Sequence, residues 1–225
     1  MKESKYLIIG SSHAGLSALD AIRVWDAEGP VMVLTQEKQL PYSPTILPYL
    51  VSGETKPEKV FLRDAEGLER LGVVFESGAR VSGLDTAGHR VNLDSGETVK
   101  YEKLLLATGA SPAAPPIEGM EEAPYHVLRT LDDASGLLSA CQDGKSAIVL
   151  GAGLIGMHAA ENLTKAGMQV TVVEALGQVL PGYFDAEAAG LIEKVFASPD
   201  PTGDVAWKWD RTRSWPGISS LWRQG

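Results

Sequence analysis

The sequence predicts an α/β fold made of two units that each contain parallel strands. An apolar run at residues 6–9 is followed by a glycine-rich turn, a helical pattern and a second apolar run. The same order of elements returns at residues 146–174. Between these units, two alternating segments, RVNL and TVKY, flank the turn DSGE and lead into the apolar run KLLLATG, which we expect to be a buried strand. Short apolar runs that alternate with helical patterns are typical of βαβ units with a parallel sheet.

The composition is that of an ordinary globular protein. Of 225 residues, 44% are hydrophobic and 22% are charged, and the net charge is −9. An excess of negative charge repels phosphate-rich partners, so we expect no nucleic-acid partner. No apolar run reaches the roughly 20 residues that span a bilayer, and residues 1–15 lack the apolar core of a signal peptide. We therefore expect a cytoplasmic protein with no membrane insertion.

The single cysteine, Cys141, bears on both redox chemistry and metal binding. It cannot form an intrachain disulfide, and it matches no metal-ligand spacing. The sequence therefore predicts neither a disulfide scaffold nor a metal site, in agreement with a reducing compartment.

The first glycine-rich turn reads Gly10, Ser11, Ser12, His13, Ala14, Gly15. It keeps the first and third glycines of the G-x-G-x-x-G pattern and places serine at the second, where the backbone must approach a pyrophosphate closely. The helix that follows has an apolar face made of Leu16, Leu19, Ala21 and Ile22, and the apolar run VMVL is expected to be a buried strand. The turn predicts a nucleotide site, with a tight strand-to-helix turn without ligand as the alternative.

The second glycine-rich turn matches the full pattern. Gly151, Gly153 and Gly156 follow a β-branched strand, and the next helix ends near Gly167. Glu174 ends the following strand, close to the roughly 20-residue distance at which a carboxylate accepts hydrogen bonds from an adenosine ribose. A carboxylate there repels a 2′-phosphate. The sequence therefore predicts a site for NAD rather than NADP.

Two further segments resemble the pyridine nucleotide-disulfide oxidoreductase class. LLLATGASPAAPPIEG, at residues 104–119, looks like the A-T-G motif of that class. LPYSPTILPYLVSG, at residues 40–53, resembles the segment that runs past the flavin in its ferredoxin, rubredoxin and nitrite reductase branches. The resemblance covers residues 5–197. It implies an FAD domain interrupted by an inserted NAD(H) domain, so that the later glycine-rich turn belongs to the second domain.

This resemblance sets the expected domain limits. The FAD-binding domain would take residues 1–115, a linker 116–144, a partial NAD(H)-binding domain 145–197, and an atypical tail 198–225. The tail has no helical or strand period and holds four of the five tryptophans. A frameshift or truncation would explain it, and a partner-docking tail with aromatic anchors is the alternative. The fold class expected is α/β, with two Rossmann-like dinucleotide-binding domains of which the NAD(H) domain is incomplete.

The resemblance also implies which residues bind FAD. The amides of residues 10–15 would hold its pyrophosphate. Thr35 stands where many relatives have the ribose-binding acid, and Glu37 is expected to supply that carboxylate instead. Arg80 and Val81 match the segment whose backbone meets the adenine. Close backbone approach to the flavin nucleotide is expected at Ala107, Thr108 and Gly109.

In the NAD(H) half, the residues expected to hold the pyrophosphate are Gly151, Gly153, Leu154, Ile155 and Gly156, with Glu174 on the ribose. Relatives tend to have a glutamate two residues after the third glycine, near the nicotinamide, and this chain has His158 there. A histidine at this position could titrate near neutrality and tune hydride exchange. A helix histidine packed at a domain interface is the alternative.

The chain departs from its relatives beside the flavin. Pro44 replaces an arginine that often follows PYS, and Tyr49 replaces the lysine of the LSK-type branches. Thr45 stands where one branch has its redox cysteine, and the paired-cysteine motif is absent. We therefore expect no disulfide chemistry, with Cys141 as a bystander thiol.

The function that the resemblance implies is that of an FAD-dependent NAD(H) oxidoreductase subunit, which passes electrons between NAD(H), flavin and an iron–sulfur partner. The cofactors do the chemistry in such enzymes, so no catalytic acid or nucleophile is expected. The sequence looks most like flavoprotein subunits of multi-subunit 2-oxoacid oxidoreductases such as phenylglyoxylate dehydrogenase. The alternative is a shortened flavoprotein fold kept as a structural or assembly subunit without its own turnover.

Overall fold

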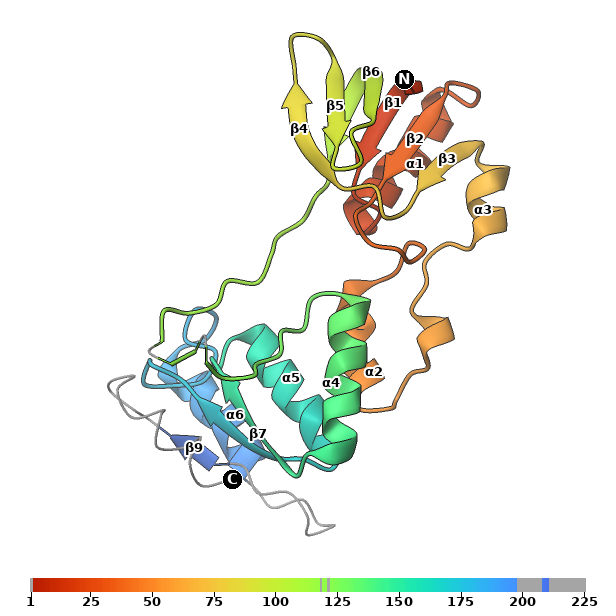
Figure 1. Ribbon diagram of the computed structural model, residues 1–225. Coiled ribbons are helices and arrows are strands. Elements are labelled where there is room, and N and C mark those ends of the chain that lie inside the picture. The colour runs from red at the N-terminus through yellow and green to blue at the C-terminus, as the bar shows by residue number, and fades with distance from the viewer. Residues whose placement is uncertain (1, 118, 121, 198–207, 211–225) are drawn as a thin grey trace. The chain divides into compact units, whose positions relative to one another are not determined.

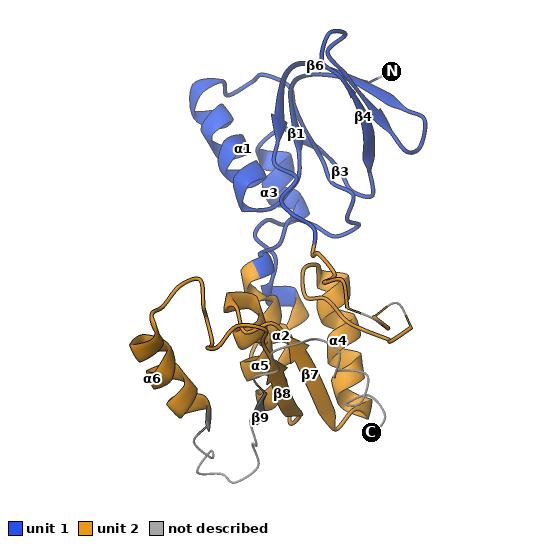
Figure 2. Cartoon of the chain, turned by 90° about the vertical axis from the view of Figure 1, so that its left-hand side faces the viewer, with its two compact units in different colours: residues 1–44, 58–111 blue, residues 45–57, 112–225 orange. Residues whose placement is uncertain are grey.

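The computed structural model describes residues 2–117, 119–120, 122–197 and 208–210. The chain divides into two compact units, residues 1–44 with 58–111 and residues 45–57 with 112–225 (Figure 2). The segment 45–57 therefore leaves the first unit and joins the second, an arrangement that the sequence pattern does not predict. Among the described residues, no helix has both the length and the apolar character needed to cross a membrane.

The first unit is built on a six-stranded sheet in the order β3-β2-β1-β6-β5-β4 (Figure 1). Its parallel strands are β1 (Lys2–Ile9), β2 (Val31–Leu34), β3 (Val73–Glu76) and β6 (Thr98–Leu106). The strands β4 (Val81–Asp85) and β5 (Arg90–Leu93) pair antiparallel, β5 also pairing with β6. The helix α1 (His13–Trp25) connects β1 to β2, as the βαβ pattern predicts.

Two hydrophobic clusters lie on opposite faces of this sheet. On one face, Leu16 and Leu19 of α1 pack against Ile8 and the β2 valines, and the short helix α3 (Ala65–Arg70) adds Leu68. The predicted apolar face of α1 is thus confirmed at Leu16 and Leu19, but Ala21 is exposed. Ala21 follows Leu19 by two residues, which on an α-helix is a rotation of more than half a turn. Ala21 therefore lies outside the buried stripe. The other face buries Leu7, Ile9, Met32, Leu34, Val91, Leu93, Val99 and Tyr101.

The prediction of a buried strand at KLLLATG is wrong for its central part. Leu105 is 38% exposed and Leu106 is 56% exposed. The reason lies in the pairing of β6, because β5 pairs only with residues 98–100 and the rest of β6 is paired with β1 alone.

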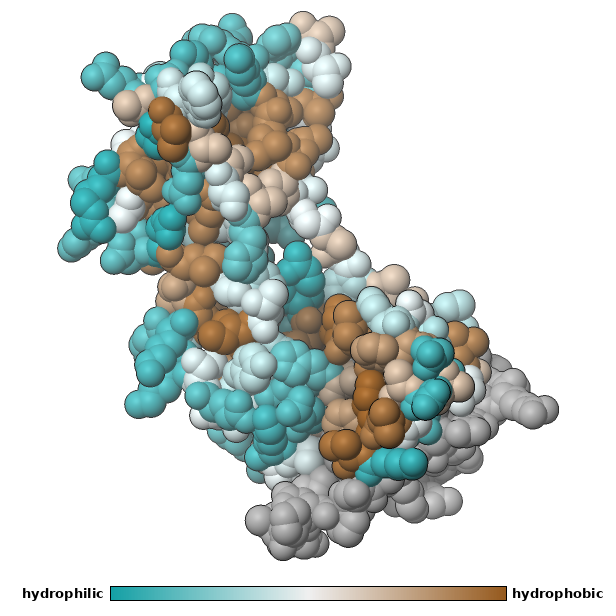
Figure 3. All heavy atoms as spheres, turned by 180° about the vertical axis from the view of Figure 1, so that it is seen from behind, coloured by the Kyte–Doolittle hydropathy of each residue, from teal (hydrophilic) through white to brown (hydrophobic). Residues whose placement is uncertain are grey.

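In a view of one face of the surface, apolar residues gather on both units between hydrophilic stretches (Figure 3).

The second unit holds the parallel strands β7 (Ser146–Leu150), β8 (Gln169–Val173) and β9 (Lys208–Asp210), in that order. The helix α5 (Leu154–Lys165) connects β7 to β8, α4 (Leu131–Asp143) precedes β7, and α6 (Ala186–Ala197) follows β8. The segment 45–57 contributes α2 (Leu47–Val51), which packs against α4 and α5. Two short 3-10 helices, η1 (Pro44–Ile46) and η2 (Pro57–Lys59), flank α2.

The strand β9 corrects one expectation about the tail. Residues 198–225 show no strand period, yet 208–210 add a third strand to the sheet by pairing with β8. The pairing is parallel, from Thr171 with Lys208 to Val173 with Asp210. The remaining residues of the tail, including Trp207, Trp215 and Trp222, lie outside the described residues.

Candidate dinucleotide-binding turns

The first turn follows β1 and is closed by two contacts that leave no room for a side chain. Gly10 has a φ of +112°, and a Cβ built on it would overlap the carbonyl oxygen of Ala107. A Cβ on Gly15 would overlap the carbonyl oxygen of Gly10. The amide of Gly10 donates to the carbonyl of Leu34, at the end of β2, over 2.8 Å. Glycine is therefore required at both positions, and α1 begins directly over the end of β1.

The start of α1 presents the groups that an anion needs. Ser12 is the N-cap, with an extended backbone and no capping hydrogen bond from its side chain. The first amides of a helix have no acceptor within the helix and carry the positive end of its dipole. Nε2 of His13 lies 3.0 Å from Oγ of Ser43, so this side chain contacts the loop after β2. The turn therefore fits a pyrophosphate at the amides of residues 10–15.

The A-T-G motif lies beside this turn. The amide of Ala107 donates to the carbonyl of Ile9 over 2.8 Å, which extends the pairing of β6 with β1. Thr108 and Gly109 follow it and are exposed, and Gly109 has a φ of +68°. The structure thus brings Ala107, Thr108 and Gly109 to the same end of the sheet as Gly10.

The two candidate ribose-binding side chains lie just after β2. Thr35 is 7% exposed, and its hydroxyl accepts from the amide of Glu37 over 3.3 Å. Glu37 is half-buried, and its carboxylate accepts a hydrogen bond from the phenol of Tyr42. Of the two, only Glu37 carries a negative charge that can accept from ribose hydroxyls.

Backbone bonds tie this loop to the segment before β4. The amide of Ala79 donates to the carbonyl of Thr35, and the amide of Gly78 donates to the carbonyl of Glu37, each over 2.8 Å. Arg80 follows and is exposed, and its side chain pairs with Asp94 over 3.2 Å. Val81 then opens β4. The structure therefore brings Arg80 and Val81 close to the end of β2. Pro44 begins η1, in the chain that leaves the first unit.

The second turn repeats the geometry of the first around β7. Gly151 has a φ of +96°, and its amide donates to the carbonyl of Val173 over 2.7 Å. A Cβ on Gly156 would overlap the carbonyl oxygen of Gly151. Gly153 is the N-cap of α5, and a Cβ there would meet nothing within 4 Å. The space above the turn is therefore open at the position where a pyrophosphate would lie.

The side chains that begin α5 lie on the surface. Leu154 is 52% exposed and Ile155 is 72% exposed. Neither side chain closes the end of the helix, so its first amides stay accessible to an anion.

Glu174 is anchored on this turn. Its Oε2 accepts from the amide of Ala152 over 2.7 Å, and its Oε1 accepts from the amide of Leu176 over 2.9 Å. Each carboxylate oxygen has two lone pairs, so both oxygens keep capacity for ribose hydroxyls. The geometry holds a negative charge against the glycine-rich turn, at the end of β8.

His158 lies on α5, one helical turn after its start. Its ring meets the ring of Tyr49 edge to face, with centroids 5.0 Å apart and an interplanar angle of 73°. The carbonyl of His158 accepts from Nδ2 of the fully buried Asn162. This histidine therefore contacts α2 within the second unit.

Three side chains contact predicted site residues but are not themselves among the predicted site residues. Tyr42 bonds Glu37, Ser43 contacts His13, and Tyr49 contacts His158. All three lie in the segment 40–53 that resembles the flavin-passing segment of relatives, so its polar and aromatic residues are the signal that could have identified them.

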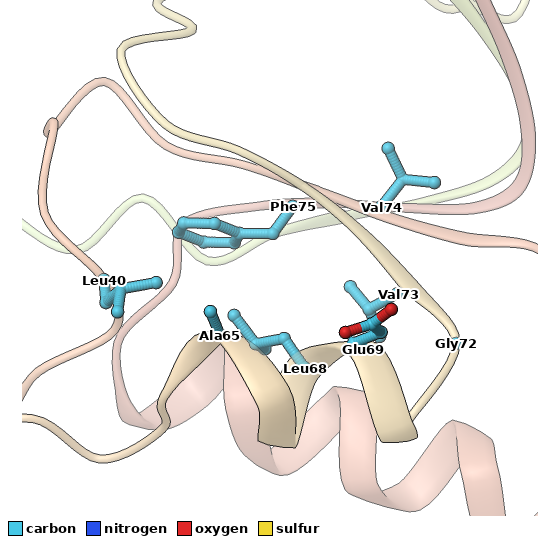
Figure 4. A pocket seen from close by; sticks show the side chains of 8 residues that line it. All are labelled: Leu40, Ala65, Leu68, Glu69, Gly72, Val73, Val74 and Phe75. Carbon is cyan, nitrogen blue, oxygen red and sulfur yellow. The ribbon is translucent and has the colours of Figure 1, made fainter.

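Cys141 lies on α4, in neither turn. It is half-buried, and burial raises the pKa of its thiol. In the described part of the chain, no group of three histidine, cysteine, aspartate or glutamate side chains could hold a metal ion. An apolar recess of about 380 Å³ opens between α3 and β3, where Leu40, Leu68 and Phe75 converge (Figure 4). It involves none of the predicted site residues.

Known proteins resemble this chain in sequence and in fold. The family model for pyridine nucleotide-disulphide oxidoreductases matches residues 4–200. The epsilon subunit of the NADH-dependent phenylglyoxylate dehydrogenase of Aromatoleum evansii is 55% identical over 87% of this chain and 47% of its own length. The ferredoxin–NAD(+) reductase component of the biphenyl dioxygenase system of Paraburkholderia xenovorans is 36% identical over 77% of this chain and 42% of its own length.

The fold has a solved counterpart as well. The NADH:rubredoxin oxidoreductase of Clostridium acetobutylicum superposes with a TM-score of 0.84 at 22% identity, over 99% of this chain and 56% of that one. The chain spans about half the length of the curated relatives that it matches. The family model covers both glycine-rich βαβ turns in the order in which they occur in the chain. This chain is therefore a member of the pyridine nucleotide-disulphide oxidoreductase family.

Proposed function

We propose that the chain is the FAD- and NAD(H)-binding part of an oxidoreductase subunit that passes electrons between NAD(H), flavin and an iron–sulfur partner. We further propose that this subunit belongs to a multi-subunit 2-oxoacid dehydrogenase of the phenylglyoxylate dehydrogenase type. The observation that carries the proposal is the 55% identity to the epsilon subunit of such an enzyme, over 87% of this chain.

The two turns would divide the cofactors between them. The first turn, with Glu37 and the A-T-G segment, would hold FAD. The second turn, with Glu174 at its end, would hold NAD(H). Glu174 supports the choice of NAD(H) over its phosphorylated form, because its carboxylate is fixed on the turn by two backbone amides and would lie against a 2′-phosphate.

The role of the protein in this proposal is binding and orientation. When bound, FAD would take up hydride and release electrons one at a time. The amides that begin α1 and α5 would hold the two pyrophosphates, and the carboxylates of Glu37 and Glu174 would orient the two riboses. The described residues supply no redox cysteine beside either turn, since the chain's one cysteine lies on α4. This supports a partner protein as the electron acceptor, and the unpaired thiol favours a cytoplasmic location.

The proposal is tested by measuring both cofactors on the same preparation. The purified 225-residue chain should bind NADH in a calorimetric titration, and it should gain flavin absorbance when it is prepared together with the other subunits of its complex. If the chain bound neither NADH nor FAD, whether alone or prepared with the other subunits, the proposal would be contradicted. That result would favour a structural or assembly subunit. Binding of FAD by the chain alone, at one per chain after gel filtration, would show that no other polypeptide is needed to close the site.

A further inference from the structure

The helix α6 of the second unit has an apolar face that is exposed to solvent. Its inner side is held by Ala189, which is fully buried, and by Glu193, whose Oε1 accepts from the amide of Val179 over 3.2 Å. On the outer side, Leu191 is 61% exposed and Val195 is 73% exposed. These two side chains are four residues apart, so they are neighbours on the surface of the helix. Adjacent exposed apolar side chains mark a surface that makes contacts.

The loop before α6 adds two more exposed apolar side chains. Tyr183 is 61% exposed and Phe184 is 44% exposed. The backbone of Phe184 is fixed on both sides, because its amide donates to the carbonyl of Leu180 over 3.2 Å and its carbonyl accepts from Nε2 of Gln178 over 2.8 Å. The two rings are therefore held just before the helix begins.

Gly190 lies in the middle of α6, next to Leu191. Among the described residues, a Cβ built on Gly190 would meet nothing within 4 Å, so packing within the chain does not require glycine there. Glycine inside a helix is unfavourable compared with alanine. It does allow a second backbone or side chain to approach closely. Its position beside exposed apolar side chains therefore indicates that another helix packs on this face.

Two opposite charges lie on the same side of α6. Glu187 is in the first turn and Lys194 is in the last turn, and both are exposed. They are seven residues apart, which is two helical turns or about 10 Å along the axis. The helix dipole favours these signs at the two ends, but it does not require both charges on the face of Leu191 and Val195. An antiparallel copy of the same helix would present a lysine to Glu187 and a glutamate to Lys194.

We propose that α6 is a self-association surface, on which two copies of this chain pack their α6 helices antiparallel about a two-fold axis. Glu187 of each copy then faces Lys194 of the other, and the axis passes between residues 190 and 191. This register places Leu191 of each copy over Gly190 of the other. Each contact occurs twice in such an interface. The proposal holds whichever cofactor the second turn binds.

The first test is the association state of the purified 225-residue chain. Sedimentation velocity should show a monomer–dimer equilibrium that depends on concentration. Leu191→Gln should weaken the association at least tenfold, because it removes the central apolar contact. The matched control is Val24→Gln, which changes a side chain that is 79% exposed on α1 and should leave the association within about twofold. Circular dichroism verifies that each variant is folded. A chain that stayed monomeric over its whole soluble range would overturn the proposal.

Charge reversal tests the antiparallel register. Glu187→Lys and Lys194→Glu should each weaken self-association about tenfold, because like charges would face each other twice. The double variant should regain the association of the unaltered chain, and so should a mixture of the two single variants. If either single variant associated like the unaltered chain, the antiparallel pairing would be wrong.

Gly190→Ala separates the contact from the stability of the helix. It should raise the melting temperature of the dilute, monomeric chain, because alanine is the better helix former, and it should weaken the association about tenfold. Unchanged association would contradict the contact between Gly190 and Leu191.

The same variants distinguish a second copy from another subunit. If Leu191→Gln reduced binding to the other subunits of the complex and left self-association unchanged, the face would belong to one of those subunits and the proposal would be overturned. NADH titration of Leu191→Gln should match that of the unaltered chain. Loss of NADH binding by the unaltered chain would count against the proposed function and leave the association result standing.

Discussion

The two glycine-rich turns have the same local geometry in different surroundings. In both, a Cβ on the third glycine, Gly15 or Gly156, would overlap the carbonyl oxygen of the first glycine. In both, the first glycine has a positive φ. The surroundings of the first glycine differ, because a Cβ on Gly10 would overlap the Ala107 carbonyl, whereas a Cβ on Gly151 would meet nothing within 4 Å.

Sheet position explains this difference. The strand β1 lies between β2 and β6, so the end of β6 comes against Gly10. Among the described strands, β7 lies at the edge of its sheet, and no second neighbour reaches Gly151. The third glycine is thus required by the turn itself, whereas part of the requirement at Gly10 comes from a strand far away in the sequence.

The largest effect is expected at Gly10. Gly10→Ala adds a steric overlap to an unfavourable φ and should lower the free energy of unfolding by about 4 kcal/mol, whereas Gly151→Ala should cost about 1–2 kcal/mol for its φ alone. Urea unfolding followed by circular dichroism measures both. The control is Gly96→Ala, in the same unit as Gly10, with a φ of +85° and open space around its Cβ. Equal losses at Gly10 and Gly96 would show that the Ala107 contact contributes nothing.

The two carboxylates should differ in what they select. Glu174→Ala should remove most of the preference for NADH over NADPH in titrations, because the negative charge on the second turn is lost. It should also cost about 1–3 kcal/mol of folding stability, since the amides of Ala152 and Leu176 lose their acceptor. Glu37→Ala is the matched control on the first turn and should leave the NADH to NADPH ratio unchanged. If the NADH to NADPH ratio changed with Glu37→Ala but not with Glu174→Ala, NAD(H) would be assigned to the first turn and FAD to the second.

Replacing Gly153, the middle glycine of the second turn, by serine gives that turn the residue that Ser12 supplies in the first turn. Gly153→Ser should change the free energy of unfolding by less than about 0.5 kcal/mol, because the new side chain enters open space and serine is a good N-cap. NADH should bind about threefold more weakly, because the hydroxymethyl group lies where the pyrophosphate approaches the backbone. Unchanged binding would show that the middle glycine is not needed for close approach.

The smallest effect is expected outside both turns. Cys141→Ser should leave flavin reduction by NADH in the assembled complex within about twofold, because burial raises the pKa of this thiol and keeps it protonated at neutral pH. Stopped-flow absorbance measures the rate. A tenfold slower reduction, about 1.4 kcal/mol of barrier, would place the thiol in the chemistry.

Much of the fold follows from local patterns. The strands β1, β2, β7 and β8, the helices α1 and α5 and the two turns between them were all predictable, because apolar periodicity and glycine spacing are properties of neighbouring residues. The position of Glu174 was predictable for the same reason, since it ends a strand at a known distance from the turn. The hydrogen bond between Tyr42 and Glu37 could also have been predicted, because both residues lie in one short segment.

Contacts between distant segments were not predictable. The sequence alone determined two glycine-rich turns in one chain, one of them followed by a carboxylate at the ribose position, because such motifs are set by backbone geometry over a few residues. Only the tertiary structure decided that Ala107 presses on Gly10, that Leu106 is exposed, and that Tyr49 meets His158. Each of these depends on which strand or helix lies beside which, and that choice is made by packing over the whole unit rather than by the residues next to one another in the chain.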